Sequence, residues 1–317
     1  MLAAVHLVQA FTVAPRVPVV TTSAPLRLAG PVASAFGRRE FTVGAAALAA
    51  ICQQPQPALA DGDVKTVVVA GATGQTGRRC LERLAKMEGV TAIGGVRNPE
   101  KAAKKLAESK IEIRGAMIQQ GAAIDASAVE LRGIDVETLG VGELTASLKG
   151  ADGLVIAVGF VPGNPFKMTA AAAAVDNVGT VKLIDAAKAA GVKKVVLVSS
   201  ILTDAGAWGQ LDSAGYKVTN AFGQVLEAKL VAEKYLRASG LDWTIVRPGG
   251  LKADPPTGAL FVSGENTLNS GEISRDLVAD VSVAALFDSK ARNKVVEIVE
   301  SDKNGNAKSG IFNGLKM

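Results

Sequence analysis

Three glycines that follow a valine-rich run near position 70 constrain the fold of this chain more than any other feature. The run Lys65–Ala70 is typical of a strand buried on both faces. It leads into the turn Gly71-Ala72-Thr73-Gly74-Gln75-Thr76-Gly77, and an amphipathic helix is predicted over Gly77–Met87. Glycine at these spacings allows a tight turn, close approach of the backbone to a pyrophosphate and close packing of helix on sheet. The sequence predicts a dinucleotide site at the helix N-terminus; a glycine turn without a ligand is the alternative.

Apolar runs and helical patterns alternate along the rest of the chain. Further strands are predicted at Val90–Val96, Arg132–Val136, Gly153–Val158, Lys194–Ser199, Asp242–Val246 and Val295–Val299. Further helices are predicted at Pro99–Glu108, Val175–Ala190, Gly223–Ser239 and Ser274–Phe287. This alternation predicts one α/β domain over residues 61–300, a doubly wound parallel sheet of the Rossmann type. Residues 109–130 fit neither pattern and are expected to form an insertion, and residues 301–317 a loose polar tail.

The end of the second predicted strand distinguishes NAD from NADP. An acidic residue there would bind the ribose 2′-hydroxyl, but the strand ends at Val96 and continues with Arg97, and the first acid is Glu100. Arg97, joined by Arg78 just after the glycine turn, can neutralise a 2′-phosphate. NADP(H) is therefore the predicted cofactor, although Arg97 could also be a solvated loop cation.

Residues after the third and fourth strands complete the expected cofactor site. Asp135 could reach the adenine amino group, and Ala157-Val158-Gly159 would lie under the two riboses. Alternatively, Asp135 only caps the next segment and Gly159 only makes a turn. The cofactor contacts expected up to this point are Gly71, Thr73, Gly74, Gln75, Thr76, Gly77, Arg78, Arg97, Asp135, Val136, Ala157, Val158 and Gly159.

The chain has few residues for other chemistries. Its only histidine is His6 and its two cysteines are Cys52 and Cys80, so residues 61–317 contain no histidine and one cysteine. Ser-His-Asp hydrolysis, histidine general-base catalysis and a histidine or cysteine metal site are therefore excluded there, and no metal is expected. The same segment holds 31 basic and 29 acidic residues, and no basic face that would indicate a nucleic-acid partner.

Residues 1–60 are predicted to be a targeting presequence. They contain one acid, Glu40, and two apolar runs that are each too short to span a bilayer. Arg38-Arg39, the apolar run that follows and the small residues before Asp61 resemble a twin-arginine export signal. Gln9–Pro15 resembles the cleavage motif of bipartite plastid presequences in algae with red-type secondary plastids. We expect a plastid protein, in the thylakoid lumen rather than the stroma, with no transmembrane helix in its mature part.

A set of motifs follows in order along residues 65–300, and together they carry a family resemblance. They are Gly71–Gly77, Val96–Lys101, Val175–Thr180, Lys194–Ser200, Ala228–Glu233 and Thr244–Leu251. The chain resembles the atypical short-chain dehydrogenase/reductases, and within them the NmrA-like and biliverdin-reductase-B-like NAD(P)H-binding proteins, including plastid members related to flavin reductases. The resemblance implies that Ser199 and Ser200 flank the nicotinamide, that Lys229 binds its ribose, and that Pro248 and Gly249 line the carboxamide.

Ordinary members of that superfamily use Tyr-x-x-x-Lys, in which the tyrosine donates a proton and the lysine lowers its pKa. Here the spacing from Lys229 places Val225 at the tyrosine position. The remaining catalytic candidates are Ser200, Lys229 and Tyr216, the last in a predicted loop. Tyr235 is expected to pack, and Arg247 to pair with a carboxylate.

Two classes of function fit these residues. One is an NADP(H)-dependent oxidoreductase for a small-molecule acceptor that needs little protein-assisted protonation, such as a flavin, quinone or tetrapyrrole. The other is a non-catalytic NADP(H)-binding protein that senses redox state or assembles a thylakoid protein complex, which the missing tyrosine favours. An enzyme of this kind would build its acceptor pocket from the loops Phe160–Phe166, Leu202–Leu211 and Lys252–Phe261.

Overall fold

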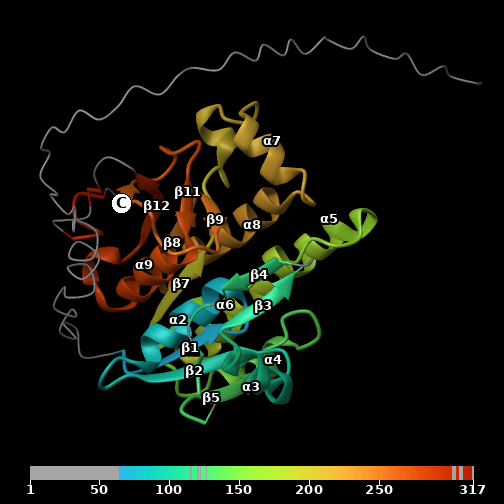
Figure 1. The fold of residues 1–317 in the computed structure, drawn as a ribbon, viewed down its shortest axis with the longest axis vertical. Coiled ribbons are helices and arrows are strands. Elements are labelled where there is room, and N and C mark those ends of the chain that lie inside the picture. Colours follow the sequence, from blue (N-terminus) through green and yellow to red (C-terminus); the bar gives the residue numbers. More distant parts are fainter. Residues whose placement is uncertain are drawn as a thin grey trace, which may run out of the picture. The chain divides into compact units, whose positions relative to one another are not determined.

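The valine-rich strand before the glycine turn lies near the middle of an eight-stranded sheet (Figure 1). The computed structural model describes residues 64–113, 116–119, 121, 123–125, 127–301, 305–306 and 310–315. The predicted presequence, residues 1–60, lies outside these described residues. The strand order is β10-β12-β8-β7-β6-β1-β2-β5. The strands are β1 (Thr66–Ala70), β2 (Thr91–Val96), β5 (Glu130–Gly133), β6 (Gly153–Ile156), β7 (Lys194–Val198), β8 (Asp242–Pro248), β10 (Ala259–Ser263) and β12 (Lys294–Ser301).

Every neighbouring pair in this sheet is parallel except β10 with β12 at one edge. The predicted doubly wound parallel sheet is therefore confirmed, with an antiparallel edge strand that the sequence pattern did not indicate. The carboxyl ends of β1, β6, β7 and β8 meet at one edge, where ligands bind in folds of this kind.

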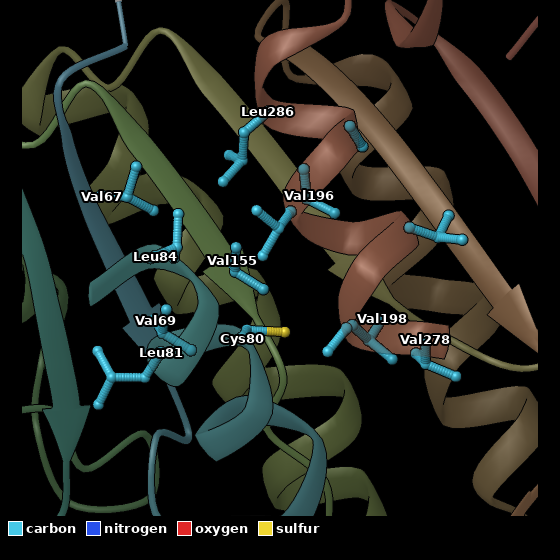
Figure 2. Close-up of a cluster of buried hydrophobic side chains, with 14 of the residues drawn as sticks. Val67, Val69, Cys80, Leu81, Leu84, Val155, Val196, Val198, Val278 and Leu286 are labelled. Carbon is cyan, nitrogen blue, oxygen red and sulfur yellow. The ribbon is translucent and has the colours of Figure 1, made fainter. Parts of the chain in front are cut away.

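Side chains of β1 alternate between two apolar layers, so each face of the sheet packs against its own helices. Val67 and Val69 belong to the layer under α2 (Gln75–Ala85), α3 (Pro99–Ala107) and α9 (Arg275–Phe287). Figure 2 shows this layer, in which Cys80, Leu81 and Leu84 of α2 meet valines of β1, β6 and β7. Val68 and Ala70 face the opposite layer, under α4 (Val141–Ser147), α6 (Thr180–Ala190) and α8 (Val225–Ala238).

The helix predicted over Val175–Ala190 is longer and less regular than expected. It begins with the 3₁₀ turn η1 (Pro165–Lys167) and α5 (Met168–Ala172), passes through the π-helix η2 (Ala173–Gly179), and ends with α6. A π-helical stretch leaves a wider turn inside an α-helix and is frequent at functional sites. Asp176 lies in this stretch and is buried.

Several smaller elements were not predicted. The segment 109–130 contains an antiparallel hairpin of β3 (Lys110–Ile113) and β4 (Ala116–Gln119). A short parallel pair joins β9 (Gly250–Lys252) and β11 (Glu272–Ser274). Helix α7 (Ala214–Asn220) and the 3₁₀ turns η3 (Ala205–Trp208) and η4 (Ser289–Ala291) complete the described elements.

The described part of the predicted loose tail contacts the domain. The amide of Asn306 forms two hydrogen bonds with the backbone of Val262 in β10, both of 2.7 Å. Phe312 is buried in the layer under α2 and α9, and the Lys294 ammonium donates to the carbonyl of Leu315. Residues 305–306 and 310–315 are therefore held by specific contacts.

Candidate cofactor and active site

The glycine turn between β1 and α2 is packed too closely for side chains. Gly71 has a φ of +84°, and a Cβ atom there would lie 2.7 Å from the carbonyl oxygen of Ala157. A Cβ atom on Gly77 would lie 2.3 Å from the carbonyl oxygen of Gly71. Because both obstacles are backbone atoms, neither position has room for another residue unless the turn moves.

The N-terminus of α2 has the properties of an anion site. No side chain caps it, and its first turn contains no acid. The first N–H groups of any α-helix lack partners within the helix and carry the positive end of its dipole. The Oε1 atom of Gln75 is also buried there without a hydrogen-bond partner in the described part of the chain. The open N–H groups of α2 and the glycine cradle fit the pyrophosphate of a dinucleotide, whereas the Gln75 oxygen is an acceptor that fits a donor group.

Two adjoining cavities of about 510 Å³ and 480 Å³ lie on either side of this turn. They share Gly74 and the segment from Ala157 to Val161 at the end of β6. The first reaches the ends of β2 and β5, and the second reaches the ends of β7 and β8. Their arrangement fits the two halves of a dinucleotide, one on each side of its pyrophosphate.

The structure brings nearly all of the predicted site residues to these cavities. The adenosine-side cavity is lined by the predicted residues Gly71, Thr73, Gly74, Arg97, Asp135, Val136, Ala157, Val158 and Gly159. The nicotinamide-side cavity adds Gln75, Thr76, Ser199, Ser200, Lys229, Pro248 and Gly249. Asp135 also accepts the backbone N–H of Glu137, so both of its predicted roles agree with its position.

Gly77 and Arg78 do not line either cavity. Gly77 lies under the turn, where it allows α2 to approach Gly71. The Arg78 guanidinium is fully buried and donates to the carbonyls of Lys105 and Leu106 at the end of α3, at 2.9 and 2.7 Å. Burial lowers the pKa of Arg78. Its side chain therefore joins α2 to α3 and does not face the ribose.

Lys105 is a cation of the adenosine-side cavity that sequence reasoning missed. Its side chain is exposed and lines that cavity together with Arg97. The signal in the sequence was weak because a lysine near the end of an amphipathic helix is normally a solvated one.

Tyr216 lies in α7 rather than in a loop, and it is not among the residues that line the cavities. Its hydroxyl donates to Glu227 at 2.9 Å. Burial and the hydrogen bond to this carboxylate raise the pKa of Tyr216, which is opposite to the shift that activates an acidic tyrosine. Tyr235 is half-exposed, and its hydroxyl donates to Asp185.

A buried ionic network lies behind Ser199, one of the residues that line the nicotinamide-side cavity. The Ser199 hydroxyl donates to Glu233 at 2.5 Å. Arg247, also fully buried, binds Glu233 at 2.6 Å and Glu297 at 3.3 Å. The expected carboxylate pairing of Arg247 is present. Because the Ser199 hydroxyl is held by Glu233, the hydroxyl of Ser200 is the nearer candidate for a ligand contact.

Lys229 forms an ion pair that the sequence did not predict. Its Nζ lies 2.8 Å from Oδ1 of Asp176, and both residues line the nicotinamide-side cavity. Val225 lines the same cavity one helical turn earlier, at the position where Tyr-x-x-x-Lys enzymes have a hydroxyl. The cavity has a lysine held by a carboxylate and no tyrosine.

Arg275 at the start of α9 is a second missed residue. It lines the nicotinamide-side cavity together with Gly74, Gln75 and Thr76. Its guanidinium donates to the carbonyl of Leu251, and no carboxylate lies within ion-pair distance of it in the described residues. Burial and the nearby Arg79 guanidinium lower the pKa of Arg275. An arginine without an acidic partner beside an open helix N-terminus fits a second phosphate contact.

The outer walls of the nicotinamide-side cavity are apolar. They are formed by Phe160, Val161, Pro162, Phe222, Val225, Leu226 and Leu251. Of the three loops expected to form walls, only Phe160–Phe166 contributes, while Leu202–Leu211 and Lys252–Phe261 do not line the cavity. Helices α7 and α8 take their place, since Thr219 of α7 and Val225, Leu226 and Lys229 of α8 line the cavity and α8 packs against η2.

Comparison with known proteins agrees with this site. The family model described as NAD(P)H-binding matches residues 115–289. An uncharacterised chloroplastic protein of Arabidopsis thaliana is 44% identical over 247 residues, which cover 76% of this chain and 79% of the Arabidopsis protein. The chloroplastic protein TIC 62 of Pisum sativum is 33% identical over 243 residues, which cover 75% of this chain and 43% of the TIC 62 chain.

Among solved structures, ChuY of Escherichia coli O157:H7, described as an anaerobillin reductase, superposes with a TM-score of 0.55 at 25% identity. It covers 76% of this chain and 99% of its own.

The chain belongs to the NAD(P)H-binding family. The resemblance to atypical short-chain dehydrogenase/reductases of the NmrA-like and biliverdin-reductase-B-like type is confirmed by these relatives and by the Rossmann sheet. These two plant relatives are described as chloroplastic, which supports the predicted plastid location.

Two further findings concern only the described residues of this NAD(P)H-binding protein. None of their helices combines the length and apolar character needed to cross a bilayer. They also contain no cluster of three or more histidine, cysteine, aspartate or glutamate side chains arranged to hold a metal ion.

Proposed function

We propose that this chain is an NADP(H)-dependent reductase of a planar acceptor such as a flavin, a quinone or a tetrapyrrole. The observation that carries the proposal is the nicotinamide-side cavity. It continues from the cofactor cradle into an apolar-walled space and contains Ser200, just after β7, and Lys229, from α8. A flat aromatic acceptor could stack there against the nicotinamide.

The residues of the chain have distinct tasks in this scheme. The bound dihydronicotinamide supplies hydride chemistry, while the glycine turn, the α2 N-terminus and Arg275 hold the phosphates. Ser200 and Lys229 face the reacting end of the cavity. Val225 has no exchangeable proton, so the acceptor takes its proton from solvent. Acceptors of the flavin or quinone type tolerate this because they are reduced readily without a protein acid. The similarity to a reductase of known structure supports the same class of reaction.

The preference for NADP(H) over NAD(H) is assigned to Arg97 together with Lys105. Both side chains are exposed at the adenosine-side cavity, where a 2′-phosphate would lie. A charge-assisted contact of this kind contributes about 1.5–3 kcal/mol. We expect Arg97→Asp to lower the NADPH/NADH affinity ratio by about tenfold or more, measured by nicotinamide fluorescence titration. Lys104→Ala, a neighbouring exposed lysine outside the cavity, is the matched control. An unchanged ratio in Arg97→Asp would rule out the assignment.

Steady-state NADPH oxidation by the purified chain tests the enzymatic proposal. FMN, a short-chain quinone and biliverdin serve as acceptors, and NADPH binding is measured on the same sample. Turnover with one of these acceptors is expected. Tight NADPH binding without turnover of any of them would overturn the proposal.

A non-catalytic NADP(H)-binding role is the second candidate, and Val225 at the tyrosine position favours it. In that role the protein would sense redox state or assist assembly of a thylakoid complex. Co-purification of a thylakoid complex with the tagged chain, dependent on bound NADPH, together with absent turnover, would support this candidate.

We further propose that the protein resides in the plastid, with the thylakoid lumen favoured over the stroma. Support comes from the arginine pair and apolar run before Asp61 and from the chloroplastic relatives. Protease treatment of isolated thylakoids tests this: a lumenal protein stays protected until the membrane is opened, whereas a stromal protein does not sediment with the thylakoids.

A further inference from the structure

The pair formed by Lys229 and Asp176 is the least expected feature of the nicotinamide-side cavity. Lys229 comes from α8 and Asp176 from the π-helix η2, and the Nζ–Oδ1 distance is 2.8 Å. The Asp176 side chain is 0% exposed and the Lys229 side chain 18% exposed. The carboxylate therefore lies behind the ammonium, and the ammonium is the part of the pair that reaches the cavity.

Both oxygens of Asp176 have a polar neighbour. Its Oδ2 accepts the backbone N–H of Phe160 at 3.0 Å, which fixes the carboxylate against the segment that follows β6. Its Oδ1 lies 2.8 Å from the Lys229 ammonium, the distance of a charged contact. The carboxylate is thus held by the backbone on one side and faces the ammonium with its other oxygen.

A buried carboxylate of this kind costs several kcal/mol unless a cation compensates it. Ion pairs that serve the fold usually satisfy both oxygens with donors, because each unmade hydrogen bond adds to that cost. Asp176 meets the Phe160 N–H with one oxygen and the Lys229 ammonium with the other, and both side chains line the cavity where hydride transfer is proposed. The same contact that compensates the buried carboxylate therefore fixes the position of the ammonium.

Hydride addition to a flavin or quinone places negative charge on an oxygen or nitrogen of the acceptor before a proton arrives. Oriented positive groups that lie where this charge develops stabilise it strongly in a site of low dielectric constant. The other cation of this cavity, Arg275, lies beside the phosphate-binding turn with Gly74, Gln75 and Thr76. Among the described lining residues, Lys229 is the cation near Ser200, Val225 and Pro248, at the reacting end.

We infer that Asp176 is a positioning residue, which holds the Lys229 ammonium over the acceptor so that it stabilises the anion formed by hydride addition. The inference rests on the proposed reductase function and specifies its acceptor class, namely planar molecules whose two-electron reduction yields an anion. No proton is transferred by the protein in this step. The hydride with its electron pair would pass from the dihydronicotinamide to the acceptor, so that the nicotinamide is oxidised and the acceptor reduced, and water supplies the proton afterwards.

Binding of two matched naphthoquinones tests the inference without turnover. Lawsone carries a hydroxyl that is ionised at neutral pH, and menadione has a neutral methyl group in its place. With the full chain and saturating NADP⁺, we expect lawsone to bind more tightly than menadione by about tenfold. Lys229→Met should abolish this ratio, Asp176→Asn should lower it, and Lys229→Arg should retain part of it. Because the readout is a ratio of two ligands, any loss of cofactor affinity cancels.

Turnover supplies the second readout. Asp176→Asn keeps the size of the side chain and an oxygen for the Phe160 N–H. We expect kcat with a quinone to fall by about ten- to a hundredfold while the NADPH dissociation constant stays within about twofold. Asp242→Asn is the matched control, because Asp242 pairs with Lys194 at the opposite edge of the sheet, and it should change neither value.

Two outcomes would overturn the inference: a folded Asp176→Asn variant with unchanged kcat and unchanged lawsone preference, or a parallel loss of kcat and NADPH affinity. The second would show that Asp176 maintains the cofactor site and does not act on the acceptor. If the wild-type chain reduces no acceptor but shows the Lys229-dependent lawsone preference, the proposed function fails and the anion site stands.

Discussion

Two lysine–aspartate pairs lie at opposite edges of the same sheet, and they differ in how their oxygens are used. At the amino edge, where β7 and β8 begin, Lys194 donates to Oδ1 of Asp242 at 2.6 Å, and Arg292 donates to Oδ2 at 2.7 Å. At the carboxyl edge, Asp176 has one cation, Lys229 at 2.8 Å from Oδ1, while its Oδ2 accepts the backbone N–H of Phe160. The first carboxylate is shared by two cations, whereas the single cation of the second lines a cavity.

The difference follows from the topology of a parallel sheet. The amino edge binds no ligand in folds of this kind, so its charges are free to pair for stability alone. Asp152 shows the same use, since it accepts the backbone N–H groups of Lys65 and Thr66 at the start of β1. At the carboxyl edge, the unpartnered Oε1 atom of Gln75 and the Asp176–Lys229 pair both lie in the nicotinamide-side cavity. Polar groups at this edge are therefore available to a ligand.

The largest effect should come from breaking the buried network under the nicotinamide side. Arg247→Met leaves the carboxylates of Glu233 and Glu297 without their shared cation, and loss of one partner of a buried pair costs about 3–5 kcal/mol. Urea unfolding measures this loss.

Arg292→Met is the control at the amino edge, where the arginine side chain is 65% exposed and Asp242 keeps Lys194. The expected cost there is below about 1 kcal/mol. Equal losses in the two variants would contradict the difference in burial between the two arginines.

The next largest effect should follow from Gly77→Ala. The added Cβ would lie 2.3 Å from the carbonyl oxygen of Gly71, so the phosphate-binding turn must shift. We expect NADPH affinity to fall by about a hundredfold, or about 2.7 kcal/mol. Gly142→Ala in α4, where the new Cβ meets no atom within 4 Å, should leave binding unchanged. Retained NADPH affinity in Gly77→Ala would refute the tight-packing argument.

A smaller and pH-dependent effect is expected at Asp152. Burial disfavours its charge, but the N–H groups of Thr66 and Lys65 together with the Lys193 ammonium lower the pKa of Asp152 below its ordinary value. A lowered folded-state pKa gives stability that is complete above the unfolded value of about 3.9 and is lost as the pH falls through the folded value.

Asp152→Asn should therefore cost about 1–2 kcal/mol at neutral pH, and the difference from wild type should shrink in acid. Unfolding curves at neutral pH and below pH 4 would check the sign, and a difference that grows in acid would be inconsistent with it.

The smallest effect concerns Cys80, which lies in the apolar layer under α2 (Figure 2). Burial raises the pKa of its thiol to about 12, so little reactive thiolate forms at ordinary pH. In a Cys52→Ser chain, iodoacetamide should leave the native protein unlabelled and unchanged in NADPH affinity, and should label it in urea. Rapid labelling of the native state, measured by mass spectrometry, would contradict the described burial.

The sequence was sufficient for the fold because local signals and tertiary structure agree along most of the chain. The alternation of β-branched runs with amphipathic helices and the glycine spacing of residues 71–77 depend only on neighbours in sequence. The cofactor cavity followed, since strand ends in a parallel sheet meet at one edge. Residues placed there by strand order, such as Asp135, Ser200 and Gly249, line the cavities as predicted.

Residues whose role depends on an irregular turn or a distant contact were missed. Asp176 reads as an ordinary helical position, and only the π-helix and the packing of α8 against it bring the carboxylate to Lys229. Arg78 follows the glycine turn closely enough to suggest a phosphate contact. Its direction is set by the end of α3, which sequence spacing from the turn does not reveal. Arg275 enters the site from a helix two hundred residues away.

Because Arg78 is buried, it contributes to the packing of α2 and does not contact the cofactor cavities. Arg78 joins the first turn of α2 to α3, whereas the exposed Arg97 and Lys105 line the adenosine-side cavity, where we propose that the 2′-phosphate lies. Under that proposal, substitutions at the two exposed positions alter coenzyme preference and leave the contact between α2 and α3 intact. Coenzyme preference could then change by successive substitutions at exposed positions, and each intermediate protein would still fold.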